Sequence, residues 1–121
     1  MPLKASCHCG AIQFEVAEAP TEVTECNCSF CSRRGGLWAY YKTVQFKLLT
    51  ARDRISTYQF GDYLGHHHHC GVCGCSTYSE FPSFESGKPD FDDPRICINA
   101  RLLEDFDLKA LPIRAVDGKA Y

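Results

Sequence analysis

Cysteine is the residue whose number and spacing most directly predict chemistry in this sequence. The 121 residues include nine cysteines, and most of these fall in three short clusters. The clusters are Cys7–Cys9, Cys26–Cys28–Cys31 and Cys70–Cys73. Thiols gathered this closely are typical of a metal site, because thiolates are preferred ligands of zinc and other soft metals. The spacing therefore predicts zinc bound by cysteine.

A disulfide framework is the competing explanation for so many cysteines. Such frameworks belong to exported proteins, which carry a signal peptide and usually have an even number of cysteines. Here the count is odd, and the start, Met1-Pro-Leu-Lys4, lacks the apolar stretch of a signal peptide. Cysteines as close as Cys7 and Cys9 would also strain a disulfide between them. We therefore expect metal binding, with a cytoplasmic location as the default.

Two of the clusters are close pairs that lie far apart in the sequence. A structural zinc site closes its four tetrahedral positions with protein ligands, and two distant pairs commonly supply them. In Cys70-Gly-Val-Cys73-Gly74 the glycines allow a tight turn whose N–H groups point at the thiolates. Cys7-His-Cys9-Gly10 is a tighter pair, also followed by glycine. We predict a structural zinc on these four cysteines; the alternative is that they are buried free thiols.

The middle cluster, Cys26-Asn-Cys28-Ser-Phe-Cys31, offers three thiols and no obvious fourth protein ligand. Three protein ligands with an open position are typical of a working zinc site, in which water or substrate takes the vacancy. Three thiolates make zinc a weak Lewis acid toward oxygen and suit a soft ligand, such as a thiol that gives up its proton. We therefore predict a catalytic-type zinc, held less firmly than the first, and a thiol substrate. The alternative is that one of these cysteines completes the structural site and the others are idle.

Mostly β-structure is expected to position these cysteines. Runs that alternate apolar and polar residues, or are rich in β-branched and aromatic residues, predict strands. These runs are residues 11–16, 38–41, 44–49, 55–60, 77–81 and 96–99. We predict an antiparallel β-fold with little helix, forming a single domain over the whole chain.

The helical and irregular segments are expected to be short. One or two helical turns should follow Cys28, with Ser29 as the cap and Gly35-Gly36 as the end. A further helical turn is expected around residues 102–108. Residues 82–94 are rich in glycine, proline, aspartate and serine, which predicts a loop.

The composition argues against two classes of partner. The net charge is −2, from 13 basic and 15 acidic side chains, which gives no electrostatic basis for binding nucleic acid or an anionic membrane. No apolar run is long enough for a transmembrane helix. We expect neither partner.

Several residues near the clusters have both a functional and an ordinary explanation. Arg33, with its neighbour Arg34, is a candidate to bind the carboxylates of a substrate, or is simply a cation at the end of a helix. Trp38 is a candidate wall of a substrate pocket, or part of the core. The run His66–His69 would place an imidazole near the metal or form an exposed polar strand, and we favour the strand.

The cysteine segments resemble the glutathione-dependent formaldehyde-activating enzyme family, also called centromere protein V-like. The resemblance covers nearly the whole chain. It is carried by Cys7-His-Cys9-Gly-Ala-Ile-Gln-Phe-Glu-Val, Cys26-Asn-Cys28-Ser-Phe-Cys31-Ser-Arg-Arg-Gly-Gly, Cys70-Gly-Val-Cys73-Gly, the tail Ile98-Asn-Ala-Arg-Leu-Leu-Glu-Asp-Phe-Asp-Leu, Leu111-Pro-Ile and Asp117-Gly118.

This resemblance implies an Mss4-like β-fold with two zinc sites. It implies a structural zinc on Cys7, Cys9, Cys70 and Cys73, and a catalytic-type zinc on the middle cluster. The activity implied is that of a carbon–sulfur lyase, an S-(hydroxymethyl)glutathione synthase, which joins glutathione to formaldehyde. The partners implied are thus a small thiol such as glutathione and a small aldehyde.

Two departures from the family pattern bear on how far this activity carries over. The chain is shorter than the full formaldehyde-activating members. Cys75 stands where the pattern usually has a small or hydroxyl residue, and we expect it to pack rather than act as a spare ligand. Cys97 is expected to lie in the core. The alternative function is that of a non-enzymatic Mss4-like protein that binds partners or carries zinc, for which the middle cluster would have no use.

Overall fold

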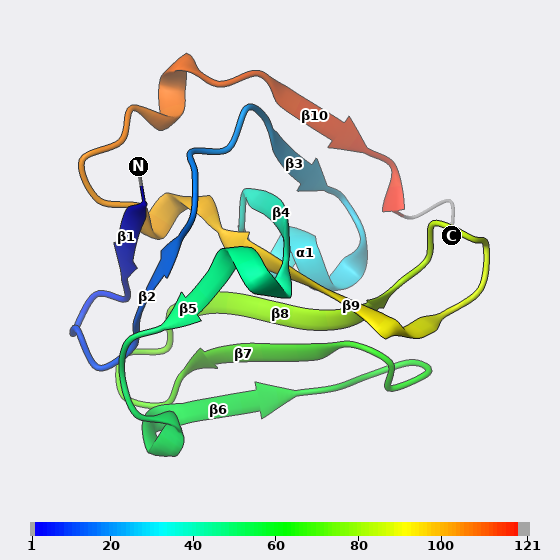
Figure 1. Cartoon of the computed structure of the whole chain (residues 1–121), viewed down its shortest axis with the longest axis horizontal. Coiled ribbons are helices and arrows are strands. Elements are labelled where there is room, and N and C mark those ends of the chain that lie inside the picture. The colour runs from blue at the N-terminus through cyan, green and yellow to red at the C-terminus, as the bar shows by residue number, and fades with distance from the viewer. Residues whose placement is uncertain (1, 119–121) are drawn as a thin grey trace.

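The strands of residues 2–118, which this computed structural model describes, form two β-sheets (Figure 1). The smaller sheet has the strand order β1 (Leu3–Ser6), β2 (Gln13–Val16), β5 (Phe46–Leu48). The larger has the order β10 (Ile113–Val116), β3 (Val23–Cys26), β4 (Trp38–Lys42), β9 (Asp90–Asn99), β8 (Ser76–Ser83), β7 (His66–Cys70), β6 (Ile55–Tyr58). All neighbours are antiparallel except β10 and β3. The expectation of a mostly β-fold with little helix is confirmed.

Helical structure is limited to short segments. The α-helix α1 spans Ser29–Arg34. The 3₁₀-helices are η1 (Thr43–Gln45), η2 (Arg52–Arg54), η3 (Ala100–Leu102) and η4 (Leu108–Ala110). Within residues 2–118, therefore, no helix has the length and apolar character needed to cross a membrane.

The core lies between the two sheets. Phe14 of β2 and Tyr78 of β8 are both almost completely buried, and their ring centroids are 6.0 Å apart. The Phe46 ring of β5 lies 4.7 Å from that of Tyr78 and 5.2 Å from that of Phe14. Each such apolar side chain stabilises the fold by roughly 2 kcal/mol through burial. These aromatic contacts hold the small sheet against one face of the large sheet.

The opposite face of the large sheet is polar even where it is buried. Ser79 is paired with Cys97 in the strand register, and both side chains are buried although the neighbouring pair, Tyr78 and Ile98, belongs to the apolar core. Helix α1 packs over this second face, where the Phe30 ring lies 4.3 Å from that of His67. The sheet therefore separates an apolar core from a polar face covered by α1.

Cysteine, rather than serine, caps α1. Cys28 is the N-cap, and its thiol accepts a hydrogen bond of 3.3 Å from the N–H of Cys31, so the expected cap at Ser29 is wrong by one residue. The expected end is confirmed, because Gly35 closes the helix in the left-handed conformation with φ +66°.

Three expected segments differ from the structure, and one of them, the strand expected at 44–49, begins only at Phe46 after η1. The loop expected at 82–94 is shorter, since β8 continues to Ser83 and β9 begins at Asp90 around a turn in which the Gly87 N–H donates to the Phe84 carbonyl. Pro82 and Pro94, which are paired in this hairpin, had suggested a loop. They are tolerated in the strands because the register of the ladder shifts next to Pro82. The helical turn expected at 102–108 is replaced by η3 and η4 on either side of it.

The histidine strand is interior rather than exposed, so the expectation of an exposed polar strand is wrong. Strand β7 lies between β6 and β8, and His68 is only 8% exposed. The His68 ring bonds the Thr57 hydroxyl at 2.8 Å through Nδ1 and lies 3.3 Å from the Glu80 carboxylate through Nε2. Partners on both neighbouring strands thus allow this imidazole to be buried.

Replacing Glu80 by glutamine should weaken the fold in a pH-dependent way. The hydrogen bond from His68 lowers the pKa of Glu80 below its ordinary value of 4.5. The carboxylate therefore stabilises the folded state above about pH 4.5, and this contribution is lost as the pH falls through the lowered pKa. We expect E80Q to lose about 0.5–1 kcal/mol at pH 7, because Glu80 is partly exposed, and a smaller amount at pH 4.5.

Urea unfolding at both pH values measures this difference. The matched control is E22Q, which changes an exposed glutamate by the same atoms. An equal loss at pH 7 and pH 4.5 would show that the Glu80 charge does not contribute.

Candidate metal centres

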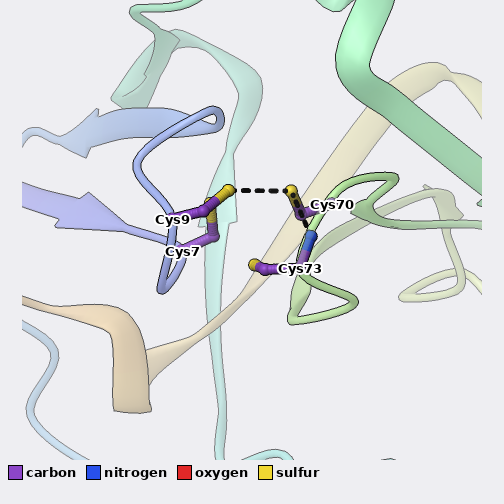
Figure 2. Close-up of side chains that lie close together, drawn as sticks. All are labelled: Cys7, Cys9, Cys70 and Cys73. Atoms are coloured by element: carbon purple, nitrogen blue, oxygen red, sulfur yellow. Dashed lines mark hydrogen bonds between the residues drawn. The ribbon is translucent and has the colours of Figure 1, made fainter.

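The first candidate centre joins two turns that are about sixty residues apart in the chain. Cys7 and Cys9 come from the turn between β1 and β2, whereas Cys70 ends β7 and Cys73 follows in the turn to β8 (Figure 2). Their Sγ atoms all lie within 4.8 Å of one another, with 3.7 Å between Cys7 and Cys9 and 3.6 Å between Cys9 and Cys70. Tetrahedral zinc with Zn–S bonds of about 2.3 Å separates its sulfurs by roughly 3.8 Å. The four thiols therefore fit a zinc ion.

Backbone N–H groups surround these thiols. The N–H groups of Val72 and Cys73 each point at the Cys70 Sγ at 3.4 Å, and that of Ile12 points at the Cys7 Sγ at 3.3 Å. Gly10 and Gly74, directly after each pair, have φ angles of +83° and +84°, which other residues adopt only with strain. The glycines thus allow the turns that aim N–H groups at sulfur.

These N–H groups favour thiolate over thiol. The N–H of Cys75 is the main cause that lowers the pKa of Cys73 to about 5. Burial opposes ionisation of Cys70, but the N–H groups of Cys73 and Val72 outweigh it, and the pKa of Cys70 is also lowered. Thiolates this close together repel one another unless a cation lies between them. The donor set and its electrostatics therefore both fit a divalent metal.

The second candidate centre has three thiols. Cys26 ends β3, Cys28 caps α1 and Cys31 lies in its first turn, with all three Sγ atoms within 4.8 Å of one another. No other histidine, cysteine or carboxylate of residues 2–118 joins this group. Burial raises the pKa of the Cys31 thiol, while the N–H of Cys31 helps to lower that of Cys28 against the effect of burial. The arrangement can hold a metal by three thiolates and leaves one position to another ligand.

A cleft of about 540 Å³, the cysteine cleft, opens beside this second group between α1 and β10. Its walls include Cys26, Cys31, Ser32, Gly35, Arg101 and Asp117. Arg101 is held there by a hydrogen bond of 3.0 Å from its Nε to the Gly35 carbonyl. The three-thiol group is therefore reachable by a small molecule, and nothing in the sequence spacing had pointed to Arg101.

Comparison with known proteins identifies the family of this chain. The family model described as "Glutathione-dependent formaldehyde-activating enzyme" matches residues 2–103. The chain belongs to this family. A crystal structure of a Rhodobacter sphaeroides protein, a structural genomics target, is similar with a TM-score of 0.71 and 27% identity, covering 91% of this chain and 98% of that chain.

The span shared with the glutathione-dependent formaldehyde-activating family includes both cysteine groups. It ends before β10 and Asp117, which form one side of the cysteine cleft. The family match therefore accounts for the thiols, and the wall that faces them comes from further along the chain.

The two residues expected to contact substrate lie outside the cysteine cleft. Arg33 lines a separate groove of about 450 Å³ on the other flank of α1, with Phe30 and Tyr58, and donates to the Ser29 carbonyl of its own helix. Trp38 is only 4% exposed, and its ring fills the space beside Gly36. Contact of either residue with substrate stays a prediction.

The two remaining cysteines lie outside both groups. Cys97 is buried in β9, as expected. Cys75 packs against Cys7 and Cys70, and its carbonyl accepts the N–H of Cys70 at 2.9 Å. Its expected packing role is therefore confirmed.

Proposed function

We propose that this protein is a zinc-dependent enzyme of the carbon–sulfur lyase type that joins a thiol such as glutathione to a small aldehyde such as formaldehyde. The observation that supports this best is the three-thiol group beside the cysteine cleft, separate from a complete four-thiol group in the same chain. A protein that only needed zinc for folding would not require the second group. The family supports glutathione and formaldehyde as the first substrates to test.

The two cysteine groups would have different roles. Cys7, Cys9, Cys70 and Cys73 would hold a structural zinc, whereas Cys26, Cys28 and Cys31 would hold the working zinc. When bound there, zinc supplies the positive charge that favours the substrate thiolate at neutral pH. The N–H of Cys31 holds the Cys28 sulfur in position at 3.3 Å. The helix cap and the metal site therefore share one residue.

The reaction needs little beyond positioning. The thiolate sulfur forms a bond to the carbonyl carbon, the C=O π electrons move to oxygen, and this oxygen takes a proton from water to give the hydroxymethyl thioether. The cysteine cleft would orient the thiol for this step. Its wall carries Arg101 together with Glu25 and Asp117, a mixture of charges that suits a zwitterionic peptide thiol.

We further propose that the chain is one zinc domain and works in a reducing compartment such as the cytoplasm. Both groups need free thiols, and all nine cysteines are free in the structure. A reducing compartment keeps them available to metal.

Metal analysis tests the two-site assignment. Protein purified with added zinc should contain two zinc ions per chain, and C28S should contain one, because only the open site loses a ligand. Elemental analysis with a protein assay gives both ratios. One zinc per chain that is unchanged in C28S would contradict the second site.

Activity of the wild-type protein tests the reaction. Because thiols add to formaldehyde readily in water, exchange between free formaldehyde and its glutathione adduct should be followed by NMR at equilibrium. We expect faster exchange in the presence of the zinc-loaded protein. A protein that holds two zinc ions without accelerating this exchange would instead be a binding or zinc-carrying protein.

A further inference from the structure

The C-terminal strap, defined as residues 113–118, crosses the second cysteine group. Strand β10 runs parallel to β3, with Val116 paired to Cys26 (Figure 1). The N–H of Asn27 donates to the Val116 carbonyl at 3.2 Å. The Asn27 side chain donates from Nδ2 to Asp117 Oδ1 at 2.9 Å. The strap is thus latched to the same loop that carries Cys26 and Cys28.

Gly118 brings the strap into contact with the thiols. A Cβ at this position would collide with Cys26 Sγ, and would lie 2.8 Å from Cys28 Cβ and 3.2 Å from Cys28 N. A Cβ atom essentially never lies within 3.0 Å of another unbonded heavy atom, so no side chain fits without movement of the strap or the cysteines. The space on this side of the group is therefore closed to even one methyl group.

The cysteine cleft is an open approach to the thiols. Cys26 and Cys31 lie on its wall, and α1 forms one side while the strap forms the other. Asp117 belongs both to this wall and to the latch with Asn27. A ligand that enters between α1 and the strap meets Cys26, whose thiol lies against Gly118.

We propose that the C-terminal strap is the wall that sets ligand size at the open site, with Gly118 as the specificity-determining residue. The site then accepts primary thiols, in which the carbon bonded to sulfur carries hydrogen atoms, and rejects thiols with methyl groups on that carbon. This inference rests on the proposed function for its ligand class. The steric role of the strap rests only on the contacts of Gly118 and Asp117.

Two thiols that differ only next to sulfur test the size limit. N-acetylcysteine is a primary thiol, and N-acetylpenicillamine has two methyl groups on the same carbon. We expect the cobalt-substituted full chain to bind N-acetylcysteine about thirtyfold more tightly, because a pocket of fixed shape discriminates about 10- to 200-fold per methyl-sized group. Titration of the thiolate-to-cobalt absorption measures both affinities. Equal affinities would overturn the size limit.

Variants of the strap test whether the strap causes the limit on ligand size. G118A should weaken N-acetylcysteine binding about tenfold, since its methyl group forces the strap or the thiols that bind the ligand to move. D117A, which removes the side-chain bond to Asn27 but adds no bulk, should loosen the end of the strap and reduce the preference between the two thiols to about threefold or less. D53A in η2 is the matched control and should behave as the wild type. If D117A keeps the full preference, the strap is not the wall.

Alkylation tests the strap without relying on thiol binding. In protein that a chelator has reduced to one zinc per chain, N-phenylmaleimide and the smaller iodoacetamide should be compared at Cys26, Cys28 and Cys31 by peptide mass spectrometry. Alkylation by the bulky N-phenylmaleimide should be about tenfold faster in D117A than in D53A, whereas the rate of alkylation by iodoacetamide should be nearly the same in both. Unchanged ratios would overturn the strap proposal whatever the wild type binds. Thiol binding that fails while these ratios change would instead count against the proposed function.

Discussion

Replacing Cys73 by serine is expected to unfold the protein under conditions in which the wild type is stable. Cys73 is one of four thiols that join the β1–β2 turn to the β7–β8 turn, so its loss opens the link between the two sheets. A structural zinc contributes apparent binding free energies of about 10–16 kcal/mol in small domains. The whole net stability of a domain is only about 5–15 kcal/mol. We therefore expect C73S to be insoluble or to lack a cooperative thermal transition.

Cys75 supplies a matched control for this experiment. It lies two residues away and packs against the same cluster but is outside the four-thiol group. C75S should remain folded and retain zinc, with a destabilisation of about 1–2 kcal/mol from placing a hydroxyl in a packed site. Circular dichroism melting and zinc content should be measured for both variants. If C73S melts like C75S, the four-thiol group does not hold the fold together.

The cysteine groups could be predicted because their chemistry is local in sequence. A pair of cysteines two or three residues apart, followed by a glycine, already specifies a turn around a metal. Cys70, Cys73 and Gly74 show this directly, since the turn has the expected left-handed glycine and N–H groups directed at sulfur. The strands with aromatic and β-branched residues were similarly visible from composition.

The strap could not be predicted because its partner lies far away in the chain. Ile113–Val116 is short and mostly exposed, and it shows no alternation of apolar and polar residues. Its position depends on parallel pairing with β3 and on the bond between Asn27 and Asp117, which are 90 residues apart. A contact of this kind leaves no periodic signal, although the Asp117-Gly118 pair resembles the end of the family's sequences.

The histidine strand shows a different limit. Polar residue type predicted exposure, but His68 is buried because Thr57 and Glu80 occupy neighbouring positions on adjacent strands. Burial of a polar group depends on whether its partners are present, and strand register determines that. The cap of α1 differs for a related reason. Cys28 takes the capping position because its thiol lies where Cys31 can donate to it, although Ser29 has the stronger general preference.

The largest functional effect is expected from replacing Cys28 by serine. This variant keeps an N-cap, because serine accepts the same backbone hydrogen bond and is a favoured capping residue. It loses one of three thiolates from the open group, and even indirect changes around a metal cost about 10–100-fold in affinity or activity. We therefore expect the acceleration of glutathione–formaldehyde exchange to fall by about 100-fold or more. The melting temperature should change by only a few degrees, about the effect of 1 kcal/mol.

The contrast between C28S and a neighbouring substitution separates chemistry from folding. S29A removes an exposed hydroxyl from the first residue of α1 and leaves all three thiols in place. It should retain both zinc ions and the full exchange rate, whereas C28S should retain one zinc ion and exchange at the uncatalysed rate. NMR exchange rates and zinc content, measured on the same samples, check both expectations. The proposed site requires all three thiolates. If C28S accelerates glutathione–formaldehyde exchange as much as S29A does, the chemistry therefore takes place at another site.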